Sequence, residues 1–140
     1  MKYSNATNYA LHTMVYLIHL PQDSTIGVQE LAEFQKLSPT YLSKILTKLT
    51  KAGLIESTPG AKGGYKISKS PNEISFLDVI TAIEGDTNLF NCSIHRHEGC
   101  LIEEVMRQSE EHMKEELRNR LLIDIVKKME KGSQAKESIN

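Results

Sequence analysis

The chain has 140 residues, of which 39% are apolar and 25% are charged, and its formal net charge is −1. This length fits one compact domain with a helical extension, and no uncharged apolar run approaches the ~18 residues that a membrane helix needs. The N-terminus lacks the small-residue cleavage pattern of a secretory signal, and the 2 cysteines are too few for a disulfide framework. We therefore expect a cytoplasmic protein with reduced thiols and no membrane partner.

Charge is distributed unevenly between the two halves of the chain. Residues 1–69 hold eight lysines against four acidic residues, a net charge of +4, whereas residues 70–140 hold nine basic against fourteen acidic residues, a net charge of −5. A basic half joined to an acidic half indicates that the first half meets a polyanion. The alternative is chance, because an imbalance of a few charges is common.

Hydrophobic periodicity predicts a helix over residues 5–20 and a second, shorter helix over residues 28–35. The apolar side chains of the first helix recur at helical spacing on one face: Leu11, Met14, Val15 and Ile18. The second helix is expected to bury three side chains: Leu31, Ala32 and Phe34.

A third helix begins at Ser38-Pro39, because serine is a favourable N-cap and proline is preorganised for the first helical position. It ends near Ala52, before Gly53. One face is apolar and is expected to pack: Leu42, Ile45, Leu46 and Leu49. The opposite face carries basic and hydroxyl-bearing side chains: Thr40, Tyr41, Lys44, Thr47, Lys48 and Lys51.

Two short strands are predicted next, over residues 54–58 and 65–68. The six residues between them, 59–64, include three glycines and one proline, which favours a long hairpin tip. The chain becomes helical again after Ser75, whose spacing from Asp78 matches a capping box, and this fourth helix ends at Gly85.

The last third of the chain divides into three parts. Residues 86–100 show no periodicity and contain both cysteines. A long helix is predicted from residue 101 to about 120, with a continuation to about 130, and residues 131–140 are expected to form a polar tail. The long helix carries a narrow apolar stripe: Ile102, Val105, Met106, Met113 and Leu117.

The order of these elements is that of a winged helix-turn-helix domain, so the fold class is mainly α with a small β-hairpin wing, over residues 1–85. In such a domain the third helix enters the major groove of double-stranded DNA and lysines contact phosphates. The predicted DNA-binding residues lie in this helix and at the hairpin tip: Ser38, Thr40, Tyr41, Lys44, Thr47, Lys48, Lys51, Lys62, Gly63 and Gly64. The alternative is a solvated lysine face without a partner.

The narrow stripe on the predicted helix at 101–130 needs a partner surface, because it cannot bury itself on so small a domain. We expect this partner to be the same helix of a second copy, in a two-fold homodimer. The alternative is that the helix folds back on the helices at 5–20 and 76–84.

Six short segments of the sequence resemble a known family: Asn8–Leu11, Leu31–Glu33, Ser38–Leu42, Lys51–Ile55, Gly63–Tyr65 and Ile80–Gly85. Together they resemble the IscR/NsrR/CymR-type bacterial regulators of the Rrf2 family, over almost the whole chain. The resemblance implies a homodimeric winged-helix transcriptional regulator, usually a repressor, that reads a pseudo-palindromic operator. It also implies that the segment after the fourth helix senses a signal.

The sequence departs from this family at several positions. Cluster-binding relatives carry three cysteines in the sensing segment, whereas this chain has two, and Met106 stands where a third could be. An acidic residue of some relatives is Asn8 here, and an arginine at the wing is Pro59, so that Lys62 takes its place. The usual glycine between the second and third helices is Lys36, which must adopt a left-handed backbone.

Three interpretations of the sensing loop at residues 86–100 remain open. In the first, Cys92 and Cys100 are redox-active thiols whose oxidation changes DNA affinity. In the second, a metal or an iron–sulfur cluster binds to Cys92, His95, His97 and Cys100, although two cysteines are few for a cluster and no cofactor is firmly expected. In the third, the cysteines are incidental and a small molecule is sensed in a pocket between helices.

An enzyme is not expected. The sequence contains no phosphate-binding loop, no His-Glu-x-x-His motif and no nucleophile elbow. A zinc-binding interaction module is a weaker alternative, because four ligands within nine residues would make a cramped site.

Overall fold

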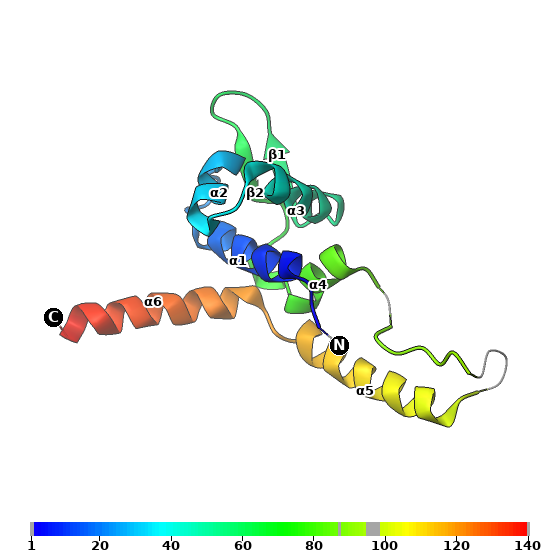
Figure 1. Ribbon diagram of the computed structural model, residues 1–140. Coiled ribbons are helices and arrows are strands. Elements are labelled where there is room, and N and C mark those ends of the chain that lie inside the picture. Colours follow the sequence, from blue (N-terminus) through cyan, green and yellow to red (C-terminus); the bar gives the residue numbers. More distant parts are fainter. Residues whose placement is uncertain (1, 87, 95–98, 140) are drawn as a thin grey trace.

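The computed structural model describes residues 2–86, 88–94 and 99–139, which form a set of helices and one small hairpin that projects at one end (Figure 1). In chain order the elements are α1 (Asn5–His19), α2 (Val28–Gln35), α3 (Pro39–Lys51), β1 (Ile55–Thr58), β2 (Gly64–Ile67), the 3-10 helix η1 (Pro71–Glu73), α4 (Phe76–Glu84), α5 (Leu101–Arg118) and α6 (Leu122–Ile139). The winged helix-turn-helix prediction and its element order are confirmed.

The predicted helix starts are explained by their caps. The Ser38 hydroxyl accepts a hydrogen bond from the backbone N–H of Tyr41 at 3.1 Å, with Pro39 in the first helical turn. Ser75 and Asp78 form the predicted capping box at the start of α4. Each cap satisfies backbone N–H groups that the first turn of a helix leaves without a partner.

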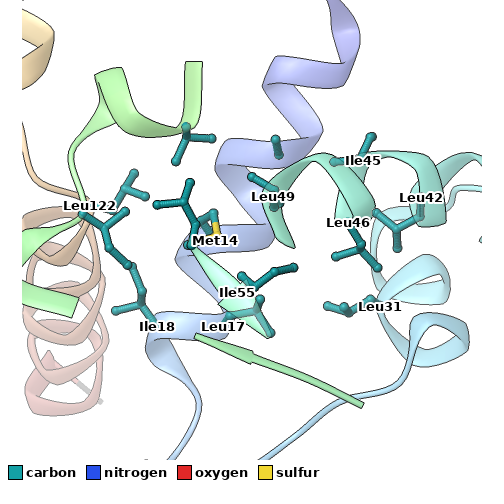
Figure 2. Close-up of a cluster of buried hydrophobic side chains, with 14 of the residues drawn as sticks. Met14, Leu17, Ile18, Leu31, Leu42, Ile45, Leu46, Leu49, Ile55 and Leu122 are labelled. Carbon is teal, nitrogen blue, oxygen red and sulfur yellow. The ribbon is translucent and has the colours of Figure 1, made fainter. Parts of the chain in front are cut away.

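One aliphatic core holds the elements together, and Figure 2 shows its side chains converging from α1, α2, α3, β1 and α6. Met14 lies at its centre and is fully buried. All four predicted core residues of α3 are buried: Leu42, Ile45, Leu46 and Leu49. Leu122 at the start of α6 joins the same core beside Ile18, so α6 is part of the domain (Figure 2).

The hairpin is tied to the helices at its base. Strands β1 and β2 pair antiparallel, with Ile55 opposite Ile67, and Tyr65 also pairs with Ile26 in the α1–α2 connection. This second pairing brings Gly64 against the backbone of Ile26, where a Cβ atom would lie 2.5 Å from the carbonyl oxygen. A glycine is therefore required at position 64 on steric grounds.

Lys36 adopts the left-handed conformation that the sequence predicts, with φ 57° and ψ 43° at the end of α2. Phe34, by contrast, is 62% exposed, so its predicted burial is wrong. Its ring packs against the Tyr16 ring instead, at a centroid distance of 4.6 Å. The periodicity of an eight-residue helix places Phe34 near the apolar face but cannot fix which side of α1 it meets.

The predicted helix from residue 101 to about 120 corresponds to α5, which ends at Arg118, whereas the predicted continuation to about 130 is a separate helix, α6, which begins at Leu122. The break is caused by pairing with a distant segment. The backbone N–H of Phe76 donates to the carbonyl of Arg120 at 2.9 Å, and the N–H of Leu122 donates to the carbonyl of Ile74 at 3.0 Å. These bonds replace the helical ones at this point, and α5 and α6 extend in opposite directions from it (Figure 1).

The residues of the predicted polar tail, 131–140, are helical as far as Ile139, where α6 ends. Within the described residues, no helix is long and apolar enough to cross a membrane.

Candidate DNA interface and sensing segment

The outer face of α3 presents the side chains that the sequence selects for DNA contact. Six residues of this face are exposed: Thr40, Tyr41, Lys44, Thr47, Lys48 and Lys51. We call them the α3 face. Because the opposite side of the same helix is locked into the core, the α3 face has a fixed orientation relative to the hairpin.

Two hydroxyls near this face have structural partners. Ser38 caps α3, and Thr47 donates a hydrogen bond to the carbonyl of Ser43 at 2.8 Å. Tyr41 makes an edge-to-face contact with Tyr9 of α1, at a ring-centroid distance of 6.0 Å, and remains 37% exposed. The contact with α1 thus restricts the orientation of the Tyr41 ring.

The lysines of the α3 face make no close ion pair within the described residues. Within the described part of the chain, none of Lys44, Lys48 and Lys51 forms an ion pair with a carboxylate. Lys66 in the hairpin differs, because its ammonium lies 3.5 Å from a carboxylate oxygen of Glu56. Lysines without internal ion pairs could neutralise phosphates without first breaking internal contacts.

The hairpin tip supplies the second part of the predicted interface. Lys62 is exposed, while its backbone carbonyl accepts a hydrogen bond from the Thr25 hydroxyl at 3.1 Å. At Gly63 a Cβ atom would lie 1.9 Å from the carbonyl oxygen of Thr58, so the tight tip excludes any side chain there. The hairpin projects at the end of the molecule opposite α5 and α6 (Figure 1).

Glu84, the last residue of α4, connects three elements of the domain. Its Oε1 atom accepts hydrogen bonds from the Ser4 N–H at 2.8 Å, the Ser4 hydroxyl at 2.7 Å and the Thr7 hydroxyl at 2.6 Å. The Thr7 and Ser4 hydrogen bonds, aided by the charge of Lys48, hold the pKa of Glu84 below its usual value of 4.5. Glu84 therefore interacts with the start of α1 through hydrogen bonds and with Lys48 of the α3 face through its charge.

Both cysteines lie in the loop that leads from α4 to α5, Cys92 within it and Cys100 at its end. Both are half-buried. The backbone N–H of Cys92 donates to Glu103 Oε2 at 3.0 Å, which ties the loop to α5, and Cys100 is the N-cap residue of α5. His95 and His97 lie outside the described residues.

A metal centre is not formed by the residues that the structure describes. Cys92 and Cys100 offer two thiolates, whereas protein-bound iron–sulfur clusters are generally held by four ligands. No group of three or more His, Cys, Asp or Glu residues is placed to hold a metal ion in the described ranges. The described donor set does not fit a cluster.

The predicted dimer stripe divides between two environments. Ile102 is 67% exposed and Val105 is 61% exposed, and the neighbouring Leu101 is 79% exposed. Met106 and Leu117 are half-buried, and Leu117 lines the space between α4 and α5. Met113 lies between these extremes, at 37% exposure. Part of the stripe thus packs within the protomer, and its N-terminal part does not.

Three features of the structure were missed from the sequence. Glu84 lies in the family-like segment Ile80–Gly85, but its contact with Ser4 was not foreseen, because Ser4 lies eighty residues away in the sequence. Glu110 is 5% exposed, and the available signal was its position within the spacing of Met106, Met113 and Leu117. An apolar groove of about 390 Å³ between α1 and α6 was also unforeseen, because it depends on the packing of α6 against α1.

A family model described as Rrf2, an iron-dependent transcriptional regulator, matches residues 3–128 of this chain. Among curated proteins, the HTH-type transcriptional regulator NsrR of Halalkalibacterium halodurans is 32% identical over 76% of this chain and 73% of its own length. YffB of Lactococcus lactis, named as an HTH-type transcriptional regulator, is 40% identical over 64% of this chain. The chain spans only 58% of that relative's length.

Solved structures give the same result for the fold. CymR of B. subtilis, described as its global cysteine regulator, has a TM-score of 0.76 and 27% identity, covering 91% of this chain and 97% of its own. The oxidised form of Staphylococcus aureus CymR has a TM-score of 0.72 and 29% identity, covering 90% and 96%. IscR of T. potens has a TM-score of 0.77 and 27% identity, covering 94% and 90%.

Proposed function

This chain belongs to the Rrf2 family of transcriptional regulators, not enzymes, and we propose that it represses transcription by binding a pseudo-palindromic operator as a homodimer. One observation carries the DNA-binding part of the proposal. The α3 face holds three lysines without an internal ion-pair partner in the described chain, beside a wing whose tip bears another lysine. This surface is complementary to a phosphate backbone.

The proposed roles of the interface residues follow from their positions in α3 and at the hairpin tip. Thr40 and Tyr41 lie in the first turn of α3, and the N-terminal residues of such a helix are the ones that approach base edges. Lys44 and Lys48 lie further along the helix, where they meet phosphates. Lys62 at the wing tip contacts the backbone or the minor groove beside the helix. Phosphate contacts give affinity, and the first-turn residues give sequence preference.

The homodimer is supported by the uncovered apolar surface at the start of α5. Leu101, Ile102 and Val105 are all more than half exposed, although they occupy neighbouring positions of an amphipathic helix. The same surface of a second copy would cover them about a two-fold axis. Two recognition helices would then meet half-sites about one helical turn apart, or a multiple of it.

We further propose that oxidation of the sensing loop releases the DNA. A peroxide oxidises the Cys100 thiolate to a sulfenic acid, and attack by the Cys92 thiol then forms a disulfide and releases water. Cys100 begins α5 and the Cys92 backbone holds Glu103, so the new bond would act on the start of the proposed dimer helix. An oxidised form of S. aureus CymR has been solved, which supports redox chemistry in a relative. Mixed and intersubunit disulfides are the alternative products.

A second candidate signal is a small molecule in the apolar groove between α1 and α6. The groove has a volume of about 390 Å³ and is lined by the rings of Phe34 and Phe76. Its other apolar walls include Leu11, Val15 and Ile125. A ligand there would bind by apolar contact and would bear on the packing of α6 against the helix-turn-helix domain.

The test of the proposed function is footprinting of operator fragments that the purified protein selects from genomic DNA. We expect protection of two half-sites with two-fold symmetry, centred about one helical turn apart or a multiple of it. Protection without symmetry would contradict the homodimer, and uniform binding to all fragments would contradict a specific operator.

A further inference from the structure

Glu110 is a buried carboxylate that the protein itself does not neutralise. Its side chain is 5% exposed on the face of α5 that packs against α4. In the part of the chain that the structure describes, neither of its carboxylate oxygens has a hydrogen-bond partner. A buried acidic group normally has a hydrogen bond or a cation beside it, so an unpartnered one indicates a place for a ligand.

Glu110 lines a small cavity, which we call the α4–α5 cavity. It has a volume of about 80 Å³ and is bounded by α4, α5 and the N-terminal residues Lys2 and Tyr3. This is several times the ~10–15 Å³ that one water molecule requires. The cavity also has apolar walls, which include Leu77 and Ile80.

A second carboxylate, that of Glu84, lines the same cavity. All three hydrogen bonds of Glu84 are accepted by Oε1, so within the described chain Oε2 has no donor. Lys2 and Lys114 line the cavity as well, so the expected affinity for a cation rests on the carboxylate oxygens of Glu110 and on Oε2 of Glu84, which accept no hydrogen bond within the described chain. A positively charged group is the chemistry that this arrangement would bind.

Two lysines line the cavity, Lys2 and Lys114, and in the described chain neither forms an ion pair with Glu110 or Glu84. The ammonium of Lys114 lies 3.7 Å from Asp86 and 3.8 Å from Glu111, at the protein surface. A metal ion is disfavoured, since no group of three or more metal-ligating side chains occurs among the described residues. The apolar wall instead fits the carbon atoms of an organic cation.

We propose that the α4–α5 cavity binds a small organic molecule through a primary ammonium group. The ammonium donates hydrogen bonds to Glu110 and to Oε2 of Glu84, and the short carbon chain lies against Leu77 and Ile80. A simple amine and an α-amino acid share this chemistry. For an amino acid, Lys114 at the edge of the cavity would receive the carboxylate. This site is separate from the α3 face, the cysteines and the apolar groove.

The test is isothermal titration calorimetry of the full chain, without DNA, so that its outcome does not depend on the proposed operator binding. The probes are n-propylamine, L-alanine, and propionate as the matched molecule without an ammonium group. We expect saturable binding of at least one ammonium probe and none of propionate. Binding of propionate alone, or of no probe, would overturn the proposal.

Variants identify the site and the ligand type. Glu110→Gln should lower the affinity at least tenfold, whereas Glu104→Gln, at an exposed position of the same helix, should leave it unchanged. If Glu110→Gln fails to fold, Glu84→Gln provides the same comparison because its amide oxygen still accepts the Ser4 and Thr7 hydrogen bonds. Lys114→Ala should weaken L-alanine but not n-propylamine. Wild-type affinity in a folded Glu110→Gln variant would place binding elsewhere and overturn the assignment.

Discussion

The Oε1 atom of Glu84 accepts hydrogen bonds from both the N–H and the hydroxyl of Ser4, so the last residue of α4 holds the N-cap residue of α1. Since the Ser4 hydroxyl also accepts from the Thr7 N–H at 3.3 Å, this contact stabilises the start of α1 directly. The loop at residues 86–100 begins two positions after Glu84. A movement of that loop therefore acts first on the contact between α4 and α1.

Acid stability should depend on Glu84. Its pKa is lowered in the folded state, chiefly by the Thr7 hydrogen bond, so the ionised form contributes stability above the usual value of 4.5. This contribution falls as the pH drops through the lowered folded value. We expect Glu84→Gln to reduce the free energy of unfolding at neutral pH and to reduce the loss of stability on acidification. Urea unfolding across this range measures both effects, with Glu73→Gln as the exposed control.

The backbone of Lys36 gives a prediction about stability. Its left-handed conformation disfavours any residue with a Cβ atom, and its side chain is exposed. We expect Lys36→Gly to raise the free energy of unfolding by about 1 kcal/mol, because glycine adopts this conformation without strain. Lys36→Ala removes the same side chain but keeps the Cβ atom, so it should not stabilise. Equal effects of the two substitutions in urea unfolding would refute the backbone explanation.

Salt dependence of DNA binding should report the α3 face. The double variant Lys44→Ala/Lys48→Ala should bind operator and non-operator DNA more weakly, and the slope of log affinity against log salt should fall by about 0.9 for each phosphate that is no longer neutralised. Fluorescence anisotropy over a salt series measures the slope. The matched control is Lys127→Ala/Lys128→Ala, on exposed positions of α6. An unchanged slope in the α3 variant would exclude these lysines from the interface.

Association should depend on the exposed start of α5. Ile102→Glu and Val105→Glu place charge on the uncovered surface and should convert a dimer to monomers, with loss of operator binding. Sedimentation velocity gives the mass directly. Gln108→Glu adds the same charge at another exposed position of α5 and should leave the dimer intact. If both apolar-face variants remain dimeric, the interface lies on another surface.

Oxidation should weaken DNA binding through the two thiols. Wild-type protein should lose operator affinity after treatment with mild peroxide and regain it after treatment with a thiol reductant. A Cys92→Ser/Cys100→Ser variant should keep its affinity under the same treatment. Gel shifts combined with mass spectrometry of the intact protein identify the product. Equal loss of affinity in the variant would favour a signal bound in the groove between α1 and α6.

The sequence was sufficient for elements whose ends depend on local chemistry. Ser38 and Pro39 start α3, Ser75 and Asp78 start α4, and the buried face of α3 follows its periodicity. The left-handed Lys36 was foreseen from the family resemblance, because a glycine usually stands at this position. These features are set by neighbours within a few residues, which a single sequence contains.

Features set by distant contacts could not be predicted in this way. The interruption between α5 and α6 depends on pairing of Ser75 with Leu121, so the sequence allowed both a helix end near residue 120 and a continuation to about 130. The role of Glu84 depends on Ser4, and the burial of Glu110 depends on which face of α5 meets α4. In each case the local sequence allows several partners, and tertiary packing selects one.

The short ladder between residues 74–76 and 120–122 brings together the two ends of the segment that contains α4, the loop at 86–100 and α5, and α4 itself packs in the core of the domain. These hydrogen bonds hold the two ends of the segment together, so the loop at 86–100 can change in length or shape without moving the start of α6. The placement of α6 on α1 is thereby insulated from such changes. This architecture allows the loop to vary in sequence and chemistry among descendants of one ancestor without requiring the DNA-binding domain to be rebuilt.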